Sequence, residues 1–191
     1  MTKTKTTFRI AARPLLAAGV SLAVPLVAMQ LTAEVNWTPG DFAFAGALIF
    51  GTGFAFELAL RATASTAYRW AVGLALAAGF LLVWVNGAVG IIGSSDNSAN
   101  LMYAGVLAVG VSGAFVARLR PRGMARAMVA AAVAQALVAL IAIGYGLGRP
   151  YSGALELLLL NGFWVGLFLT SAGLFRSAAQ EQTSAGAGAM G

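Results

Sequence analysis

Four polar side chains interrupt long apolar stretches of the sequence and are the candidates for chemistry inside a membrane: Glu57, Asn86, Gln135 and Asn161. Polar groups are costly in hydrocarbon, so each needs a partner or a function. Glu57 is the only carboxylate of the four and precedes Arg61 by four residues, the spacing of an ion pair on one helix face. On one interpretation, Glu57 is a functional carboxylate that takes up a proton or balances the charge of a substrate. On the other, it is one half of an interfacial ion pair that reaches the headgroups.

The three amides indicate binding and not proton transfer, because an amide binds carbonyls, hydroxyls or dehydrated ions but has no useful titrating proton. Helical rise places Asn86 and Asn161 about 8 and 10 Å below the expected outer face, and Gln135 about 12 Å from the inner face. Asn86 and Asn161 therefore share a level and are candidates for a mutual contact. The amides either line a path for a polar substrate or hydrogen-bond across helices and hold them together.

Arginines and glycines mark two candidate contact surfaces. Four arginines in one short segment predict a contact with an anionic lipid headgroup or an acidic partner. The same charges also keep such a segment in the cytoplasm, which is the alternative interpretation. Gly162 and Gly166 form a small-xxx-small pair that allows another helix to approach closely, within the chain or between subunits. The arginines are Arg118, Arg120, Arg122 and Arg126.

Absent residue types restrict the chemistry further. The chain has no histidine and no cysteine, the common ligands of haem iron and zinc and the common general base and nucleophile. Lys3 and Lys5 are the only lysines and stand in the polar N-terminal segment, so no embedded amine can bind retinal as a Schiff base. We expect no enzyme and no haem, zinc or retinal. A carotenoid or quinone stays open, because the 11 phenylalanines and 24 glycines can line an apolar slot.

Composition places these residues in a membrane protein. Hydrophobic residues make up 60% of the 191 residues and charged residues 9%, too few to cover a soluble globule. Continuous apolar runs such as 158–160 exclude the alternating strands of a barrel. Six stretches are apolar enough to cross a hydrocarbon core about 30 Å thick as helices. The predicted fold is an all-α, polytopic helical bundle with spans at 12–33, 42–60, 70–91, 101–117, 127–147 and 154–175.

Basic residues predict the orientation. With the N-terminus in the cytoplasm, all of the 12 Lys and Arg except Arg149 lie inside, so both termini are expected there. The net charge of +6 then faces anionic headgroups, and nucleic acid is not expected as a partner. We predict a basic cytoplasmic segment at 1–11, a six-helix transmembrane domain at 12–176 and a disordered cytoplasmic tail at 177–191. Cleavage of the first apolar run as a signal peptide would leave five spans.

An internal similarity favours a repeat. At an offset of 59 residues, segments 45–61 and 104–120 agree at 8 of 17 positions. This pattern predicts a parallel repeat of a helical hairpin, with spans two and three repeated in spans four and five. Chance identity in a chain rich in alanine and glycine is the alternative.

Three segments carry a resemblance to known proteins: EVNW at 34–37 with DF at 41–42, NLMY at 100–103, and RPRGMAR at 120–126. In these the chain resembles a set of uncharacterised small multi-pass inner-membrane proteins of proteobacteria, from the first span through the fifth. The resemblance implies a location in the bacterial inner membrane. It implies no activity and no catalytic or binding residue.

Two functions fit these features. Little intramembrane charge, abundant small residues and short loops favour an accessory or structural subunit, or an assembly factor, of a membrane complex. The alternative is a small oligomeric transporter or channel that uses the four polar span residues. An intramembrane enzyme would need a nucleophile or a pair of acids, which the spans do not offer. The expected partners are the bilayer, with anionic headgroups on the cytoplasmic side, and a membrane protein or further copies of this chain.

Overall fold

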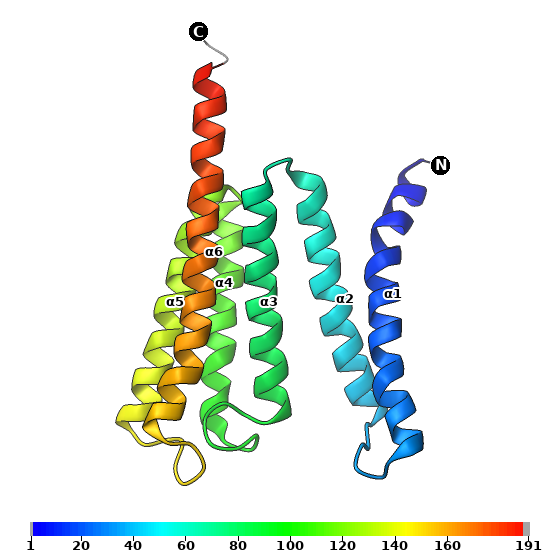
Figure 1. The fold of residues 1–191 in the computed structure, drawn as a ribbon, viewed down its shortest axis with the longest axis vertical. Helices are drawn as coiled ribbons and strands as arrows, with labels where there is room; N and C mark the ends of the chain where they lie inside the picture. Colours follow the sequence, from blue (N-terminus) through cyan, green and yellow to red (C-terminus); the bar gives the residue numbers. More distant parts are fainter. Residues whose placement is uncertain (1, 189–191) are drawn as a thin grey trace. The chain divides into compact units, whose positions relative to one another are not determined.

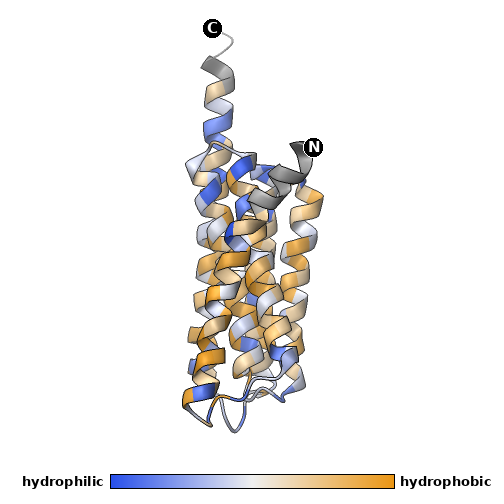
Figure 2. Cartoon of the chain, turned by 90° about the vertical axis from the view of Figure 1, so that its right-hand side faces the viewer, coloured by the Kyte–Doolittle hydropathy of each residue, from blue (hydrophilic) through white to orange (hydrophobic). Residues whose placement is uncertain are grey.

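The computed structural model describes residues 2–188, with side chains described over 11–61 and 63–185, and its regular structure there is entirely helical. Six of these helices are long and apolar enough to cross a membrane, which confirms the predicted all-α fold (Figure 1). Apolar residues fill the middle of the helices, and hydrophilic ones gather toward their ends (Figure 2). The elements are α1 (Thr2–Leu31), α2 (Pro39–Ala62), α3 (Thr66–Ala88), the short 3-10 helix η1 (Ser98–Leu101), α4 (Met102–Ala117), α5 (Pro121–Gly144) and α6 (Ala154–Gly188).

The chain divides into two compact units, Met1–Ala64 with α1 and α2, and Ser65–Gly191 with α3 to α6. The six spans that the sequence suggested as one domain are thus distributed over two units. The predicted hairpin repeat is not confirmed. Its first copy would combine α2 and α3, which fall in different units, whereas α4 and α5 pack together within one.

The two-helix unit is held by close packing and a defined start to α2. A Cβ placed on Gly53 would lie 3.2 Å from the Cβ of Pro14, so the absence of a side chain lets α1 approach. α2 begins with a capping box. The hydroxyl of Thr38 accepts a hydrogen bond from the amide of Asp41, and the Asp41 carboxylate accepts one from the Thr38 amide at 2.7 Å.

In the four-helix unit, α5 packs against α4 and α6, and α3 packs against α6. Two side chains of α6 bind the backbone of α3. The indole N–H of Trp164 donates to the carbonyl of Ala78 at 3.2 Å, and the Ser171 hydroxyl donates to the carbonyl of Ala71 at 2.8 Å. Donors and acceptors are each seven residues apart, so they face each other along two antiparallel helices. The buried alanines on α3 allow this close approach.

Small residues also bring α4 and α5 together. A Cβ on Gly113 would lie 2.6 Å from the Cβ of Ala127, and a Cβ on Gly123 would lie 2.6 Å from the Cβ of Ala117. These distances are shorter than any ordinary contact between side chains, so a glycine is required at both positions. The two helices are therefore in tight contact at the turn that joins them and further along their length.

The C-terminal end of α6 differs from the sequence prediction. Residues 177–191 were expected to be disordered, but α6 continues as helix through Gly188, and the last three residues lie outside the described part. Two contacts anchor the extension. The Glu181 carboxylate accepts a hydrogen bond from the Ser65 hydroxyl at 2.7 Å, and the Thr183 hydroxyl accepts one from Arg122 at 3.1 Å. Within its unit, α6 projects past the ends of α3, α4 and α5 (Figure 1).

Candidate functional site

Glu57 forms the ion pair that its spacing predicted. Its side chain is 10% exposed and lies 3.0 Å from Arg61, which confirms the i, i+4 pair. Arg13 of α1 lies 3.9 Å from the same oxygen, Oε1, and its side chain is 81% exposed. The carboxylate therefore connects α1 to α2, and its partners reach out from the helix pair as long side chains at a membrane interface do. This arrangement fits the interpretation of Glu57 as one half of an interfacial ion pair.

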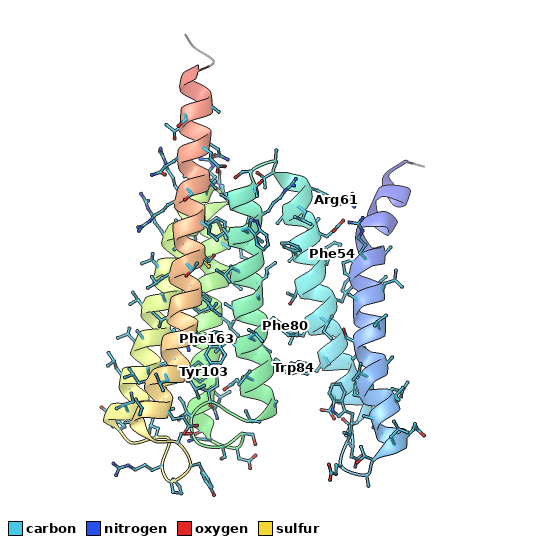
Figure 3. The ribbon with its side chains drawn as sticks, in the orientation of Figure 1. Phe54, Arg61, Phe80, Trp84, Tyr103 and Phe163 are labelled. Atoms are coloured by element: carbon cyan, nitrogen blue, oxygen red, sulfur yellow. The ribbon has the colours of Figure 1, made fainter. Side chains whose placement is uncertain are left out.

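Gln135, Asn161 and Tyr103 form a buried polar cluster that joins α5, α6 and α4. Gln135 Nε2 donates to Asn161 Oδ1 at 2.9 Å, and the Tyr103 hydroxyl donates to the same oxygen at 3.0 Å. All three residues are almost completely buried, and Tyr103 lies inside its unit in Figure 3. Sequence analysis did not select Tyr103 for a site. Its position near the start of a predicted span, as a hydroxyl among apolar residues, was the available indication.

One hydrogen bond fixes the orientation of both amides in this cluster. Asn161 Nδ2 donates to the carbonyl of Leu157, one turn earlier on α6, at 2.8 Å. Asn161 Oδ1 is therefore the atom that faces Gln135 and Tyr103, and Gln135 must present its NH₂ group to it. The other end of the amide, Gln135 Oε1, is buried and has no donor among the described residues. This oxygen can accept one further hydrogen bond.

Asn86 and Asn161 were expected to share a level, but they bind different partners. Asn86 Nδ2 donates to the carbonyl of Asn100 at 3.3 Å, and its buried Oδ1 has no donor in the described part of the chain. The Asn100 side chain is itself buried and accepts hydrogen bonds from the amides of Ile91 and Ile92 at 3.1 and 2.9 Å. Asn100 thus organises the loop between α3 and α4. In the sequence it stood out only as part of the segment NLMY at 100–103.

Gly162 and Gly166 lie on the exposed side of α6. A Cβ added to either residue would meet no atom within 4 Å. The close helix contact expected at this pair is therefore not made within the described chain. A contact between subunits stays a prediction. The close contacts of the four-helix unit occur at Gly113 and Gly123 instead.

The four arginines of the predicted contact surface are all exposed around the turn between α4 and α5. Arg122 donates from Nη2 to the hydroxyl of Thr183 on α6 at 3.1 Å. The ion pairs of Glu57 with Arg13 and Arg61 do not involve this turn. The turn is therefore a concentrated and accessible region of positive charge.

Comparison of the chain with models of protein families, with curated proteins and with solved structures gives no match. The resemblance to proteobacterial inner-membrane proteins consequently stays a prediction. Within the residues that the structure describes, no group of three or more metal-binding side chains occurs. The six apolar helices define the class of the protein: it is an integral, multi-pass membrane protein.

Proposed function

We propose that this protein is an accessory or structural subunit, or an assembly factor, of a membrane complex in the bacterial inner membrane, with both termini in the cytoplasm. One observation carries the proposal: the buried amides of the spans bind the protein's own helices. Asn161 accepts hydrogen bonds from Gln135 and Tyr103 and donates one to Leu157. A transport path needs polar groups that a solute can reach, whereas these are buried against one another and act as contacts between helices.

The end of α6 supports the same proposal, because it offers a contact element outside the bilayer. The 35 residues of α6 make a helix about 52 Å long, about 20 Å more than the hydrocarbon core requires. The hydrogen bonds of Glu181 and Thr183 hold this extension against residues of its own unit. Residues 180–185 are nevertheless exposed. We expect a partner subunit to bind this exposed part of the helix.

Purification of a tagged copy from its native membrane in a mild detergent tests the proposal. Mass spectrometry of the intact particle detects a second protein, and an absorption spectrum of the same particle detects a carotenoid or quinone. A chain that ends after residue 179 should lose the partner, because it lacks the exposed part of α6. A chain that ends after residue 185 keeps both anchoring hydrogen bonds and should retain it. A pure and stable monomer without any partner would contradict the proposal.

A small oligomeric transporter or channel is the second candidate, and one observation favours it. Gln135 Oε1 and Asn86 Oδ1 are buried acceptors that no described residue satisfies, and such oxygens can bind a hydroxyl, an ammonium group or a dehydrated cation. Flux measurements in liposomes separate the two candidates. A flux that falls in Gln135→Ala and persists in Arg149→Gln supports transport. A flux that is unchanged in both Gln135→Ala and Asn161→Ala excludes a path through these residues.

A further inference from the structure

The end of the four-helix unit where α4 turns into α5 concentrates positive charge, and the carboxylate of Glu181 lies on the adjoining stretch of α6, two residues before Thr183. We name residues 115–126 the arginine turn. No carboxylate forms an ion pair with it in the part of the chain described, where Glu57 holds both ion pairs. Arg122 donates to the hydroxyl of Thr183, a neutral group. The exposed cations of the turn are Arg118, Arg120, Arg122 and Arg126.

The backbone of the arginine turn is held in one conformation. Arg118 and Leu119 have left-handed φ values of 48° and 56°, which residues with a side chain adopt only when their surroundings enforce them. The Leu119 carbonyl accepts a hydrogen bond from the hydroxyl of Tyr68 on α3 at 2.7 Å. Gly123 packs directly on Ala117. Because the turn is preorganised, a ligand that binds there loses little entropy in ordering the backbone.

The same turn forms the N-terminus of α5. Pro121 occupies the beginning of the helix, and no side chain caps it. The amide of Met124 donates to the carbonyl of Arg120 at 2.9 Å. The amides of Arg122 and Gly123 lie before it and have no carbonyl within the helix to bind. A helix N-terminus also carries a partial positive charge. Free amides and guanidinium groups favour the same ligand, an anionic phosphate oxygen.

Exposed apolar side chains adjoin these charges. Phe115 and Val116, in the last turn of α4, are 79% and 86% exposed, and Leu119 is 60% exposed. A soluble anion gains nothing from such side chains. A phospholipid, in contrast, can place its acyl chains against them and its phosphate at the arginines. The combination of cations, free amides and apolar side chains in one turn therefore indicates a lipid as the ligand.

We propose that the arginine turn is a binding site for an anionic phospholipid, with the phosphate at Arg120, Arg122 and the start of α5, and the acyl chains against Phe115 and Val116. The site is separate from the proposed role as an accessory subunit, because it requires no protein partner. Each arginine at an anionic membrane surface raises affinity about fivefold. Two arginines together account for about 25-fold.

Lipid binding to the full-length protein tests the proposal. The protein is purified in a neutral detergent and titrated with short-chain phosphatidylglycerol, and native mass spectrometry measures the bound fraction. Arg120→Gln/Arg122→Gln should weaken binding about 25-fold. Thr183→Ala is the matched control for structure, since it removes the hydrogen bond to Arg122 and keeps every charge. Arg149→Gln is the matched control for charge at the opposite end of the unit. Both controls should bind as the wild type does.

Several results would overturn the proposal. Wild-type affinity in the double variant would show that these arginines do not bind the phosphate. A loss of about fivefold in Arg149→Gln, as large as that for one arginine of the turn, would show that only net charge matters. Equal affinity for phosphatidylcholine would show that the anionic charge is not recognised. Phosphatidylglycerol should raise the melting temperature, and an equal rise with inorganic phosphate alone would replace the lipid by a free anion. If the double variant misfolds, Arg120→Gln alone provides a single-charge test with an expected loss of about fivefold.

Discussion

The cluster of Gln135, Asn161 and Tyr103 predicts an unequal response to the loss of its two amides. Asn161→Leu deletes the acceptor that both donors share, so Gln135 Nε2 and the Tyr103 hydroxyl remain buried without a partner. Gln135→Met leaves Asn161 bonded to Tyr103 and at the same time removes the unsatisfied Oε1. Methionine is unbranched and close to glutamine in shape, so it adds little strain. We therefore expect the asparagine to be the costlier of the two to replace.

The hydrogen bonds of the cluster give the expected changes in the free energy of unfolding. Hydrogen bonds between membrane helices contribute about 0.6–1.7 kcal/mol each, so the two interhelical bonds lost in Asn161→Leu amount to about 1–3 kcal/mol. The bond from Asn161 to the carbonyl of Leu157 within α6 is lost as well. Gln135→Met loses one bond but also removes an unpaired acceptor, whose burial costs about 1–3 kcal/mol. Its net effect should therefore lie between a cost of about 1 kcal/mol and a gain of about 2 kcal/mol. In the double variant no glutamine donor is left unpaired. It should be more stable than Asn161→Leu alone by about 1 kcal/mol.

Reversible unfolding in mixed detergent micelles measures all four proteins of this double-mutant cycle. Gln182→Met makes the same chemical change on the exposed part of α6 and should stay within about 0.5 kcal/mol of the wild type. Two results would refute the reasoning. In the first, Gln135→Met costs as much free energy as Asn161→Leu. In the second, the two costs add in the double variant, which would mean that the amides do not depend on each other.

Three further substitutions test the packing of the two units. Gly113→Ala places a Cβ 2.6 Å from that of Ala127 and should destabilise the protein by about 1–3 kcal/mol in detergent unfolding. Gly162→Ala is the control, because its Cβ meets open space and should not destabilise the protein. Equal effects of the two substitutions would contradict the α4–α5 contact. Glu57→Gln keeps the shape of the side chain and removes the charge, so its cost should be below about 1 kcal/mol and should shrink with added salt. A larger, salt-independent loss would mean that the pair is shielded from solvent. Asn100→Ala leaves two loop amides unpaired and should speed their hydrogen exchange, while unchanged exchange would contradict its role as their acceptor.

The six spans were predictable from the sequence because bilayer thickness fixes the length of an apolar helix. The pair of Glu57 with Arg61 was predictable for a similar reason, since helical geometry alone brings residues four apart together. Arg13 was not, because its approach depends on how α1 packs on α2. The C-terminal tail was mispredicted on its polarity. A helix already formed in the membrane continues at little cost when contacts such as Thr183 with Arg122 hold it.

The candidate site was predictable only in part. The sequence predicted Asn86 and Asn161 at the same depth in the membrane. Depth alone does not define the direction in which each side chain points. α3 faces α6 through the carbonyls that Trp164 and Ser171 bind, and Asn86 contacts the loop between α3 and α4 instead. The contact expected at Gly162 and Gly166 was not predictable from the sequence for the same reason. Small residues permit close approach of a helix, but only the packing of the whole unit decides where it occurs.

The pairing of α3 with α6 has a consequence for the order of events during synthesis. Ser171 follows its acceptor Ala71 by 100 residues, and Trp164 follows Ala78 by 86. At about 5–20 residues per second, α3 waits in the membrane for roughly 5–20 s before its partner emerges from the ribosome. α1 and α2 are neighbours in sequence and need no such delay. The four-helix unit thus closes only when nearly the entire chain has been made, and α3 is the span that most needs protection by the insertion machinery until then.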